Sequence, residues 1–336
     1  METNRSIWAL LVGIDEYRDK PLAGCVNDVE ALRDYLIGDL GVPERQVATL
    51  CNRQATRAGI LDAFQDFLTF NPAIRPGDQI LFHFSGHGSR MRDPDGIEPD
   101  GLNETLVPYD SRTANAYDIP DKTLAGLLEQ LVAAKGSNVT VMLDCCHSGS
   151  GTRGPARVRG IDPDPRRPPP GLDSERLAAR GASYHGWHGP GESYVLLAAC
   201  RDRETSQEYP APGREGRTAW YGPLTYFVLQ GLEHLPPSAT YADLYESIAY
   251  RINAANPGQM PQCEGDRDRA VFGEARMRRA PFFLIHELGG RQFQLNGGLI
   301  HGVAEGTEFT VYPGPHRAEP GSPAAIGRAI AERTSA

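Results

Sequence analysis

The stretches Ser85-Gly86-His87-Gly88 and Asp144-Cys145-Cys146-His147-Ser148-Gly149 each follow an apolar run that is typical of a buried β-strand. The two runs, at 78–84 and 139–143, are rich in β-branched and aromatic residues, and a glycine follows soon after each of them. Parallel strands end at the same edge of a sheet, and open α/β sheets bind their ligands there. We therefore expect both stretches to line one crevice.

The rest of the chain alternates between strand-like and helix-like segments. Strand-like runs lie at 7–14, 46–51, 79–85, 138–144 and 194–200, and amphipathic segments lie between and after them. This alternation predicts an α/β fold with a mainly parallel central sheet that is flanked by helices. The first helix is expected to take Asn27 as its N-cap, because Glu30 follows three residues later.

Two segments interrupt the alternation. Residues 149–190 contain many glycines, a Pro-Pro-Pro run and arginines at 153, 157, 159, 166, 167, 176 and 180, which predicts a long mobile loop. Short strand-like runs at 281–285 and 309–312 are separated by glycine-rich turns. We expect one large domain over residues 1–278 and a small β-rich C-terminal segment over residues 279–336.

Charge and cysteine content exclude several classes of protein. A net charge of −9 and the absence of a basic block argue against nucleic-acid or anionic-membrane partners. The first residues lead directly into the strand-like run at 7–14, without a signal-peptide pattern or an apolar run of membrane-spanning length. The six cysteines are scattered, several of them within apolar runs, which favours reduced thiols and a cytoplasmic location.

His87 and Cys146 together propose a catalytic dyad. Side chains alternate along a strand, so Ser85 should share a face with His87, and Asp144 should share one with Cys146. A nearby histidine can convert a thiol into a nucleophilic thiolate, and the backbone amides of Gly88 and Cys146 could form an oxyanion hole. Alone, either residue is better explained as a buried thiol or a hydrogen-bonded loop histidine. Their occurrence at two strand ends reverses that preference.

The neighbouring residues receive structural roles. Cys145 should face the core by strand parity, and His83 lies within its strand, where we expect a packed, supporting histidine. His147 directly follows the candidate nucleophile, and we assign it no proton transfer. Zinc ligation by His83, His87 and Cys146 is disfavoured, because no cysteine pair has the short spacing typical of zinc sites. No metal site is predicted.

At this point the chain resembles the caspase-like cysteine peptidases, most closely the metacaspases and their prokaryotic orthocaspase relatives. The resemblance rests on the two strand-end motifs and on Leu11-Val12-Gly13-Ile14-Asp15 with Leu22-Ala23-Gly24-Cys25-Val26-Asn27-Asp28. It runs from about residue 7 to 275. It implies a caspase-like three-layer sandwich and hydrolysis of peptide bonds, with Cys146 as nucleophile and His87 as general base and acid.

The resemblance also implies an acidic pocket for arginine or lysine before the cleaved bond. Its walls would be Cys25, Asp28, Ser85 and Asp144. Buried carboxylates bind a guanidinium through charge-assisted hydrogen bonds. Without the resemblance, Asp28 would be explained as an acidic residue in the first turn of a helix. The expected partners are proteins or peptides with arginine or lysine before the cut.

Calcium activates many metacaspases, but this sequence departs from their pattern. Asp121 is retained, whereas Asn103, Lys122 and Arg153 stand where the family has acidic residues. Two cations would repel a divalent ion, so we expect no cofactor and calcium-independent activity. A neighbouring acidic stretch is expected to be a solvated loop beside the cleft; its residues are Asp93, Asp95, Glu98, Asp100 and Glu104.

Two questions stay open at this level. The arginine-rich loop after Cys146 would suit a zymogen that is cut by the enzyme itself or by an upstream activating protease, but a flexible insertion without a regulatory role explains it equally well. One alternative to a peptidase is a catalytically idle caspase-like scaffold or regulatory protein whose C-terminal segment binds a partner. Another is hydrolysis or acyl transfer on a non-peptide substrate. A complete dyad beside a complete acidic pocket favours the enzyme.

Overall fold

The computed structural model describes residues 6–96, 98–113, 116–146, 157–169, 171–173, 193–201, 204–213, 217–236, 238–276, 285–289, 292–295, 303–311 and 326–332. The chain forms two compact units, Met1–Met277 and Arg278–Ala336, and each is described by itself. The larger unit contains every residue that the sequence analysis singled out for a site.

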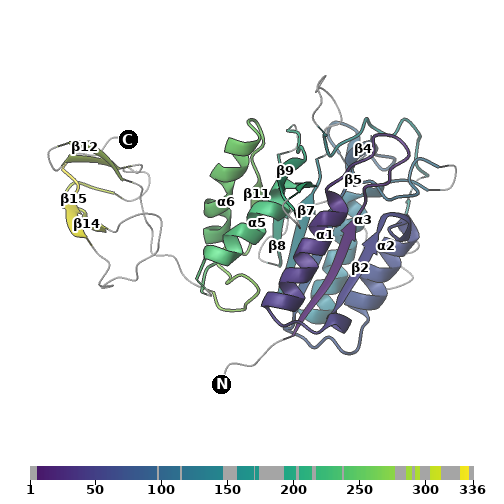
Figure 1. The fold of residues 1–336 in the computed structure, drawn as a ribbon, viewed down its shortest axis with the longest axis horizontal. Helices are drawn as coiled ribbons and strands as arrows, with labels where there is room; N and C mark the ends of the chain where they lie inside the picture. Colours follow the sequence, from purple (N-terminus) through teal and green to yellow (C-terminus); the bar gives the residue numbers. More distant parts are fainter. Residues whose placement is uncertain are drawn as a thin grey trace. The chain divides into compact units, whose positions relative to one another are not determined.

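A six-stranded sheet forms the centre of the larger unit (Figure 1). Its strands, in spatial order, are β2 (Val47–Cys51), β1 (Ile7–Gly13), β3 (Gln79–Ser85), β7 (Val139–Asp144), β8 (Val195–Ala198) and β11 (Gln262–Gly265). Neighbouring strands are parallel except for the antiparallel pair of β8 and β11. The predicted α/β class with a mainly parallel sheet is confirmed.

Helices cover both faces of this sheet. One face carries α1 (Cys25–Asp34), α5 (Pro223–His234) and α6 (Tyr241–Ala255), and the other carries α2 (Arg57–Ala63), its π-helical continuation η4 (Phe64–Thr69) and α3 (Asp121–Lys135). Alternation along β1 explains the two cores: Trp8, Leu10 and Val12 pack with α2 and α3, whereas Ala9 and Leu11 pack with α1, α5 and α6. The result is the expected three-layer sandwich.

The middle strands are apolar because both of their faces are covered. Every residue of β7 is buried, and so is every residue of β3 after the first. Near-continuous apolar runs are typical of parallel strands in this position. Each fully buried valine, leucine or phenylalanine contributes about 1.5–3 kcal/mol, so the two strands that lead to the motifs are rigidly held.

The start of α1 differs from the prediction. The helix begins at Cys25, and the Asp15 carboxylate accepts hydrogen bonds from the amides of Cys25 (2.8 Å) and Val26 (3.2 Å). Asn27 lies within the first turn, where its side-chain amide donates to the carbonyl oxygen of Trp220. The predicted N-cap at Asn27 is wrong, because a carboxylate from the preceding loop satisfies the first helical amides.

Smaller elements border the carboxyl ends of the sheet. A three-stranded antiparallel sheet contains β4 (Gly88–Arg92), β5 (Leu102–Leu106) and β6 (Ile119–Pro120), and a hairpin contains β9 (Tyr209–Pro212) and β10 (Thr218–Tyr221). Short helical turns are η1 (Tyr35–Asp39), η2 (Glu44–Gln46) and η3 (Asn52–Gln54). Because β4 begins directly after His87, the three-stranded sheet borders the carboxyl end of β3, where the motif Ser85–Gly88 lies.

The C-terminal unit consists of two antiparallel ribbons in its described part. β12 (Ile285–Gly289) pairs with β13 (Gln292–Leu295), and β14 (Glu308–Val311) pairs with β15 (Gly327–Ile330). The strand expected at 309–312 overlaps β14, while most of the one expected at 281–285 lies outside the described residues. The β-rich character of this segment is confirmed.

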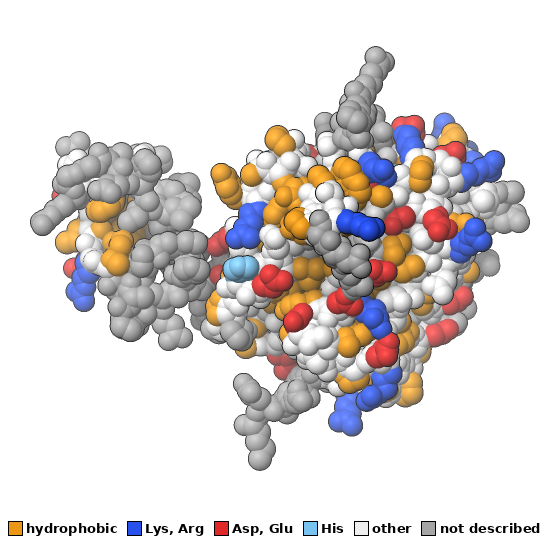
Figure 2. Space-filling view, viewed as in Figure 1, with side chains coloured by type: hydrophobic (Ala, Val, Ile, Leu, Met, Phe, Trp, Pro, Cys, Tyr) orange, Lys and Arg blue, Asp and Glu red, His pale blue; other side chains and the backbone are white. Residues whose placement is uncertain are grey.

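The surface of the larger unit is mixed in character. Figure 2 shows acidic, basic and apolar side chains interspersed over its visible face. No helix in the described ranges combines the length and the apolarity that crossing a bilayer requires.

Candidate active site

The carboxyl ends of β3 and β7 lie side by side. Ser85 pairs with Asp144 in the parallel register, so the two motifs leave the sheet at the same level. His87 and Cys146 follow two residues later, and all four side chains are buried. The two motifs therefore meet at one edge of the sheet, where we expected a crevice.

A fully buried arginine side chain, that of Arg159, occupies this crevice. Its Nη1 lies 2.8 Å from Asp28 Oδ2 and 3.3 Å from Asp144 Oδ1. The same nitrogen donates to Ser85 Oγ (2.7 Å), and the Ser85 hydroxyl donates to Asp28 (2.7 Å). Three of the four residues expected to line an acidic pocket thus surround a guanidinium from the chain itself.

The beginning of α5 orients the two aspartates. The amide of Gly222, the N-cap residue of α5, donates to both carboxylate oxygens of Asp28 (2.9 and 3.0 Å). The amide and hydroxyl of Thr225 donate to Asp144 Oδ2 (2.8 and 2.9 Å). A helix N-terminus favours negative charge, so α5 stabilises the acidic wall. Cys25, the fourth expected wall residue, has its thiol pKa raised well above the usual range by burial, although the nearby guanidinium lowers it.

Burial has a strong effect on the protonation of Asp28. Burial raises the pKa of this carboxyl group to about 8, Arg159 opposes the rise, and repulsion from Asp144 adds to it. Even with Arg159 in the pocket, the Asp28 carboxyl group therefore retains its proton to a higher pH than an exposed aspartate does.

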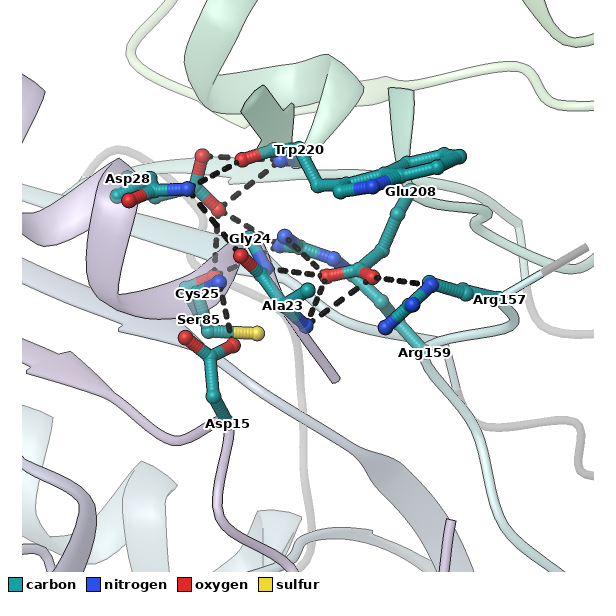
Figure 3. Close-up of polar contacts among 12 residues, drawn as sticks. Asp15, Ala23, Gly24, Cys25, Asp28, Ser85, Arg157, Arg159, Glu208 and Trp220 are labelled. Atoms are coloured by element: carbon teal, nitrogen blue, oxygen red, sulfur yellow. Dashed lines mark hydrogen bonds and ion pairs between the residues drawn. The ribbon is translucent and has the colours of Figure 1, made fainter. Parts of the chain in front are cut away.

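Glu208 is a third carboxylate of this pocket, and the sequence analysis missed it (Figure 3). Its side chain is fully buried, and Oε1 lies 3.6 Å from Arg159 Nη2. The same oxygen accepts hydrogen bonds from the amides of Ala23 (3.0 Å) and Gly24 (2.6 Å), just before α1. Glu208 precedes β9 and lies far along the chain from both motifs, in a stretch without a periodic pattern. Only the folded chain brings it to the pocket.

Asp15, Cys25 and Glu208 each offer a ligand atom within 4.8 Å of the others. The Asp15 oxygens already accept the first amides of α1, and the Glu208 oxygens accept two amides and face an arginine. This cluster is accounted for by the hydrogen bonds of the pocket.

The backbone of Arg159 lies across the strand ends as an extended peptide. Its carbonyl oxygen accepts hydrogen bonds from the amides of Gly88 (3.0 Å) and Cys146 (3.1 Å), which are the two amides expected in an oxyanion hole. Its own amide donates to Ser206 (2.8 Å), and Glu208 N donates to the carbonyl of residue 157 (2.8 Å). A peptide bound for acyl transfer would have the same three features. Its side chain would lie in a pocket, its backbone would add a strand, and its carbonyl oxygen would lie between two amides.

Arg159 belongs to the segment 149–190, for which we expected a mobile loop. Its described parts, 157–169 and 171–173, include residues held in buried contacts. The remainder of the segment, including Arg153, Arg176 and Arg180, lies outside the described residues.

His87 is oriented by the loop that follows β1. Its Nε2 lies 2.7 Å from the carbonyl oxygen of Lys20, and its backbone amide donates to the hydroxyl of Tyr17 (2.9 Å). Lys20 has a φ of 58°, an unfavourable left-handed conformation that aims this carbonyl. A carbonyl partner requires the proton on Nε2, which leaves Nδ1, buried and without a hydrogen-bond partner, as the basic nitrogen. The sequence analysis gave no signal for Lys20.

The electrostatics keep this imidazole neutral near pH 7. Burial lowers the pKa of His87 to about 4, the Lys20 carbonyl opposes that change, and the positive charge of Arg159 adds to it. A neutral imidazole is the form that can accept a proton from a thiol.

Cys146 is fully buried, with Sγ 4.0 Å from the carbonyl oxygen of Ser206. Cys145 packs in the core on the side of α2 and α3, as predicted. His147, Ser148 and Gly149 lie outside the described residues.

His83 supports the pocket from inside β3. Its Nε2 is 3.0 Å from Thr225 Oγ1, and Thr225 in turn holds Asp144. Burial lowers the pKa of His83 to about 3, so the ring is a neutral hydrogen-bonding group. This is the packed, supporting position that we expected.

Comparisons with known proteins assign part of the chain to a family. Residues 8–154 match the family model of the metacaspase, peptidase C14 domain, and this range contains both strand-end motifs. Residues 8–154 belong to the caspase-like metacaspase family. The matching proteins include Metacaspase-2 of Arabidopsis thaliana, 29% identical over 258 residues that cover 73% of this chain and 56% of the relative.

Other relatives match a shorter part of this chain. Metacaspase-1 of Eremothecium gossypii is 36% identical over 149 residues, which cover 42% of this chain and 32% of the relative. Metacaspase-1A of Aspergillus oryzae is 35% identical over 149 residues, with coverages of 42% and 34%. The chain thus spans from about a third to just over half of the length of these relatives.

One solved structure supports the fold assignment. A protein of Geobacter sulfurreducens superposes with a TM-score of 0.53 at 24% identity, covering 77% of this chain and 92% of that one. Because similar folds serve different functions, this likeness concerns the architecture alone.

The acidic residues beside β4 do not fit the calcium site that the metacaspase resemblance implied. The fully buried Lys122 Nζ lies 2.9 Å from Asp93 Oδ2 and 3.4 Å from Glu98 Oε1. Calcium needs several oxygen ligands at about 2.3–2.6 Å, and it is repelled by an ammonium group among them. Asn103, on β5, is buried, and neither atom of its side-chain amide has a hydrogen-bond partner.

The expectation of a solvated acidic stretch needs one correction. The Asp93 side chain is fully buried, because its ion pair with Lys122 takes it out of water. Asp95 and Asp100 are exposed, as expected.

Proposed function

We propose that this chain is a caspase-like cysteine endopeptidase that hydrolyses peptide bonds after arginine or lysine. The observation that carries the proposal is the double placement of Arg159, whose guanidinium lies against Asp28 and Asp144 while its carbonyl oxygen accepts two amides. A substrate residue before the cleaved bond must meet both requirements at once. Lysine should bind less well, because its ammonium cannot make the forked contacts of a guanidinium.

The proposed chemistry uses the groups around this carbonyl. Neutral His87 takes the proton of Cys146, and the thiolate attacks the carbonyl carbon of the residue before the cut. The amides of Gly88 and Cys146 stabilise the resulting oxyanion. The C–N bond then breaks while His87 gives its proton to the leaving amine, and a thioester remains. Water, deprotonated by His87, hydrolyses the thioester and restores the thiol.

The first bond to be cut is, in this proposal, the chain's own bond between Arg159 and Gly160. The segment that contains Arg159 fills the pocket, so another substrate can enter only after this segment has been cut and has left. The unprocessed chain is then a zymogen. An upstream protease with the same arginine preference would be a second route to activation.

The activity is proposed to need no cofactor and no calcium, and to operate in the cytoplasm. Lys122 supports activity without calcium, because its ammonium supplies positive charge beside Asp93 and Glu98. The six cysteines are scattered along the chain, several of them within apolar runs, which supports a reducing compartment.

Two measurements on the full chain test the proposal. Intact mass after incubation should reveal a fragment that ends at Arg159 for the wild type and for the control Cys51→Ala, but none for Cys146→Ala. Fluorogenic peptides that differ only in the residue before the cut should be cleaved after arginine and lysine, equally with calcium or with a chelator. If no such peptide is cleaved under either condition, the idle scaffold is the better description.

A further inference from the structure

The segment after Arg159 continues along β4 as an additional strand. Residues 160–164 run parallel to β4 and form bridges with it. The amide of Ile161 donates to the Gly88 carbonyl (3.1 Å), and the amide of Asp164 donates to the Arg90 carbonyl (2.8 Å). Main-chain bonds of this kind bind an extended peptide of almost any sequence.

Two side chains contact the backbone of this strand. The Ser89 hydroxyl lies 3.1 Å from the carbonyl oxygen of Ile161 and 3.0 Å from that of Asp162. Arg112 Nη1 donates to the Asp162 carbonyl (3.0 Å), and Nη2 donates to Ser89 Oγ (2.8 Å). The carbonyl groups of the second and third residues after Arg159 are therefore bound by fixed donors.

The fold holds this pair of donors firmly in place. Asp118, fully buried, accepts hydrogen bonds from Arg112 Nε (3.2 Å) and Nη2 (2.9 Å), and Thr105 Oγ1 donates to the same carboxylate (3.0 Å). Arg112 has a φ of 67°, which is unfavourable for a residue with a side chain. Ser89 is also fully buried. An unfavourable backbone conformation and a buried ion pair both cost free energy of folding. Such features are common at binding sites, where they hold a side chain in position.

The fifth position after Arg159 adds a charge requirement. The side chain of Asp164 is fully buried, with Oδ2 3.7 Å from Arg112 Nε. Arg166, from the same segment, pairs with Asp164 (2.6 Å) and stacks over the ring of Tyr117. Among the described residues outside the segment 149–190, Arg112 is the cation that pairs with Asp164.

We infer that β4, Ser89 and Arg112 form a binding site for the residues that follow the cleaved bond of protein substrates. The preferred ligand is an extended peptide with an acidic residue fifth after the cut. The chain's own residues 160–164 occupy this site before processing, and a substrate takes their place afterwards. The inference rests on the proposed peptidase function, since it describes the other half of the same cleft.

A series of substrates for the wild-type chain tests the inference without any variant. The shortest is a Val-Arg aminocoumarin amide, which has no residue after the cut. The longer ones are internally quenched peptides in which Val-Arg is followed by three or by all five residues of Gly-Ile-Asp-Pro-Asp. We expect kcat/KM to rise about tenfold from the three-residue to the five-residue peptide, in keeping with one charge-assisted contact. Asparagine in place of the final aspartate should remove most of this rise.

Variants assign the effect to the proposed residues. Ser89→Ala and Arg112→Ala should each lower kcat/KM for the five-residue peptide about tenfold more than for the amide. Arg53→Ala, at a side chain that is 82% exposed, is the matched control and should change neither. Arg112→Ala leaves the buried Asp118 without a cation, so thermal unfolding of each variant is measured together with the kinetics. If Arg112→Ala is unfolded, Ser89→Ala alone provides the test.

The outcomes separate the two proposals. If the amide is cleaved but peptide length, the fifth residue and Ser89→Ala have no selective effect, the binding site for the following residues is overturned and the peptidase proposal stands. If neither the amide nor any peptide is cleaved, both are overturned.

Discussion

The pocket around Arg159 buries more negative charge than one guanidinium neutralises. Asp28, Asp144 and Glu208 all have buried carboxylates. Arg159 is the buried cation that they share, and the partly exposed Arg157 lies 4.0 Å from Glu208. Removing such an excess of like charge from water is costly unless a cation enters or a proton is retained. Binding of a cationic residue and release of a proton are therefore coupled at this site.

Activity on arginine substrates should depend on pH through Asp28. Because burial raises its pKa to about 8, the carboxyl group is largely protonated at pH 6 and attracts a guanidinium less strongly there. We expect kcat/KM to rise between pH 6 and pH 8, and the rise to be absent in Asp28→Asn. A pH profile of kcat/KM on a Val-Arg amide checks this; the same rise in Asp28→Asn would contradict it.

Glu208 should contribute to arginine binding although no sequence motif marks it. Replacement by glutamine removes the charge and keeps the size, so we expect kcat/KM for an arginine amide to fall about tenfold or more, mainly through KM. Glu44→Gln, at a side chain that is 76% exposed, is the matched control. An unchanged KM in Glu208→Gln would show that Glu208 does not contribute to arginine binding.

At the scale of elements, the N-terminus of α5 closes the pocket. A Cβ at Gly222 would overlap Asp144 Oδ2 and Arg159 Nη1, so this position needs glycine for close approach and not for an unusual φ. The lack of a side chain lets the helix bring its first amides to the carboxylates.

Gly222→Ala should therefore block the pocket while the fold persists. We expect kcat/KM for arginine amides to fall about a hundredfold or more, which corresponds to about 2.7 kcal/mol. Gly38→Ala, where a Cβ meets no atom within 4 Å, is the control. Amide kinetics and circular dichroism are measured on both, and near-normal turnover in folded Gly222→Ala would contradict the role of α5.

The central elements were predictable because their signals are local. Apolar runs preceding the two motifs correspond to β3 and β7, and alternation along β1 divides its side chains between the two cores. The start of α1 was not predictable, since its capping carboxylate, Asp15, comes from outside the helix and no capping pattern within the helix reports it.

At the scale of the whole molecule, the pocket and the segment that fills it belong to the same chain. Cleavage after Arg159 should then be first-order, with a rate constant that does not change when the protein is diluted about a hundredfold. Gel densitometry of the fragment over time at several concentrations measures this rate. A rate constant proportional to concentration would indicate cleavage between molecules instead.

The sequence alone determined the layered α/β architecture, the two strand-end motifs and, by resemblance, a pocket lined by Asp28, Ser85 and Asp144. These features follow from side-chain periodicity and from short motifs, which are local properties. Tertiary structure alone decided which of the loop arginines enters the pocket, that Glu208 joins it, and that the Lys20 carbonyl orients His87. Such contacts join chain segments that meet only after folding. Burial then strengthens their hydrogen bonds and ion pairs by excluding water.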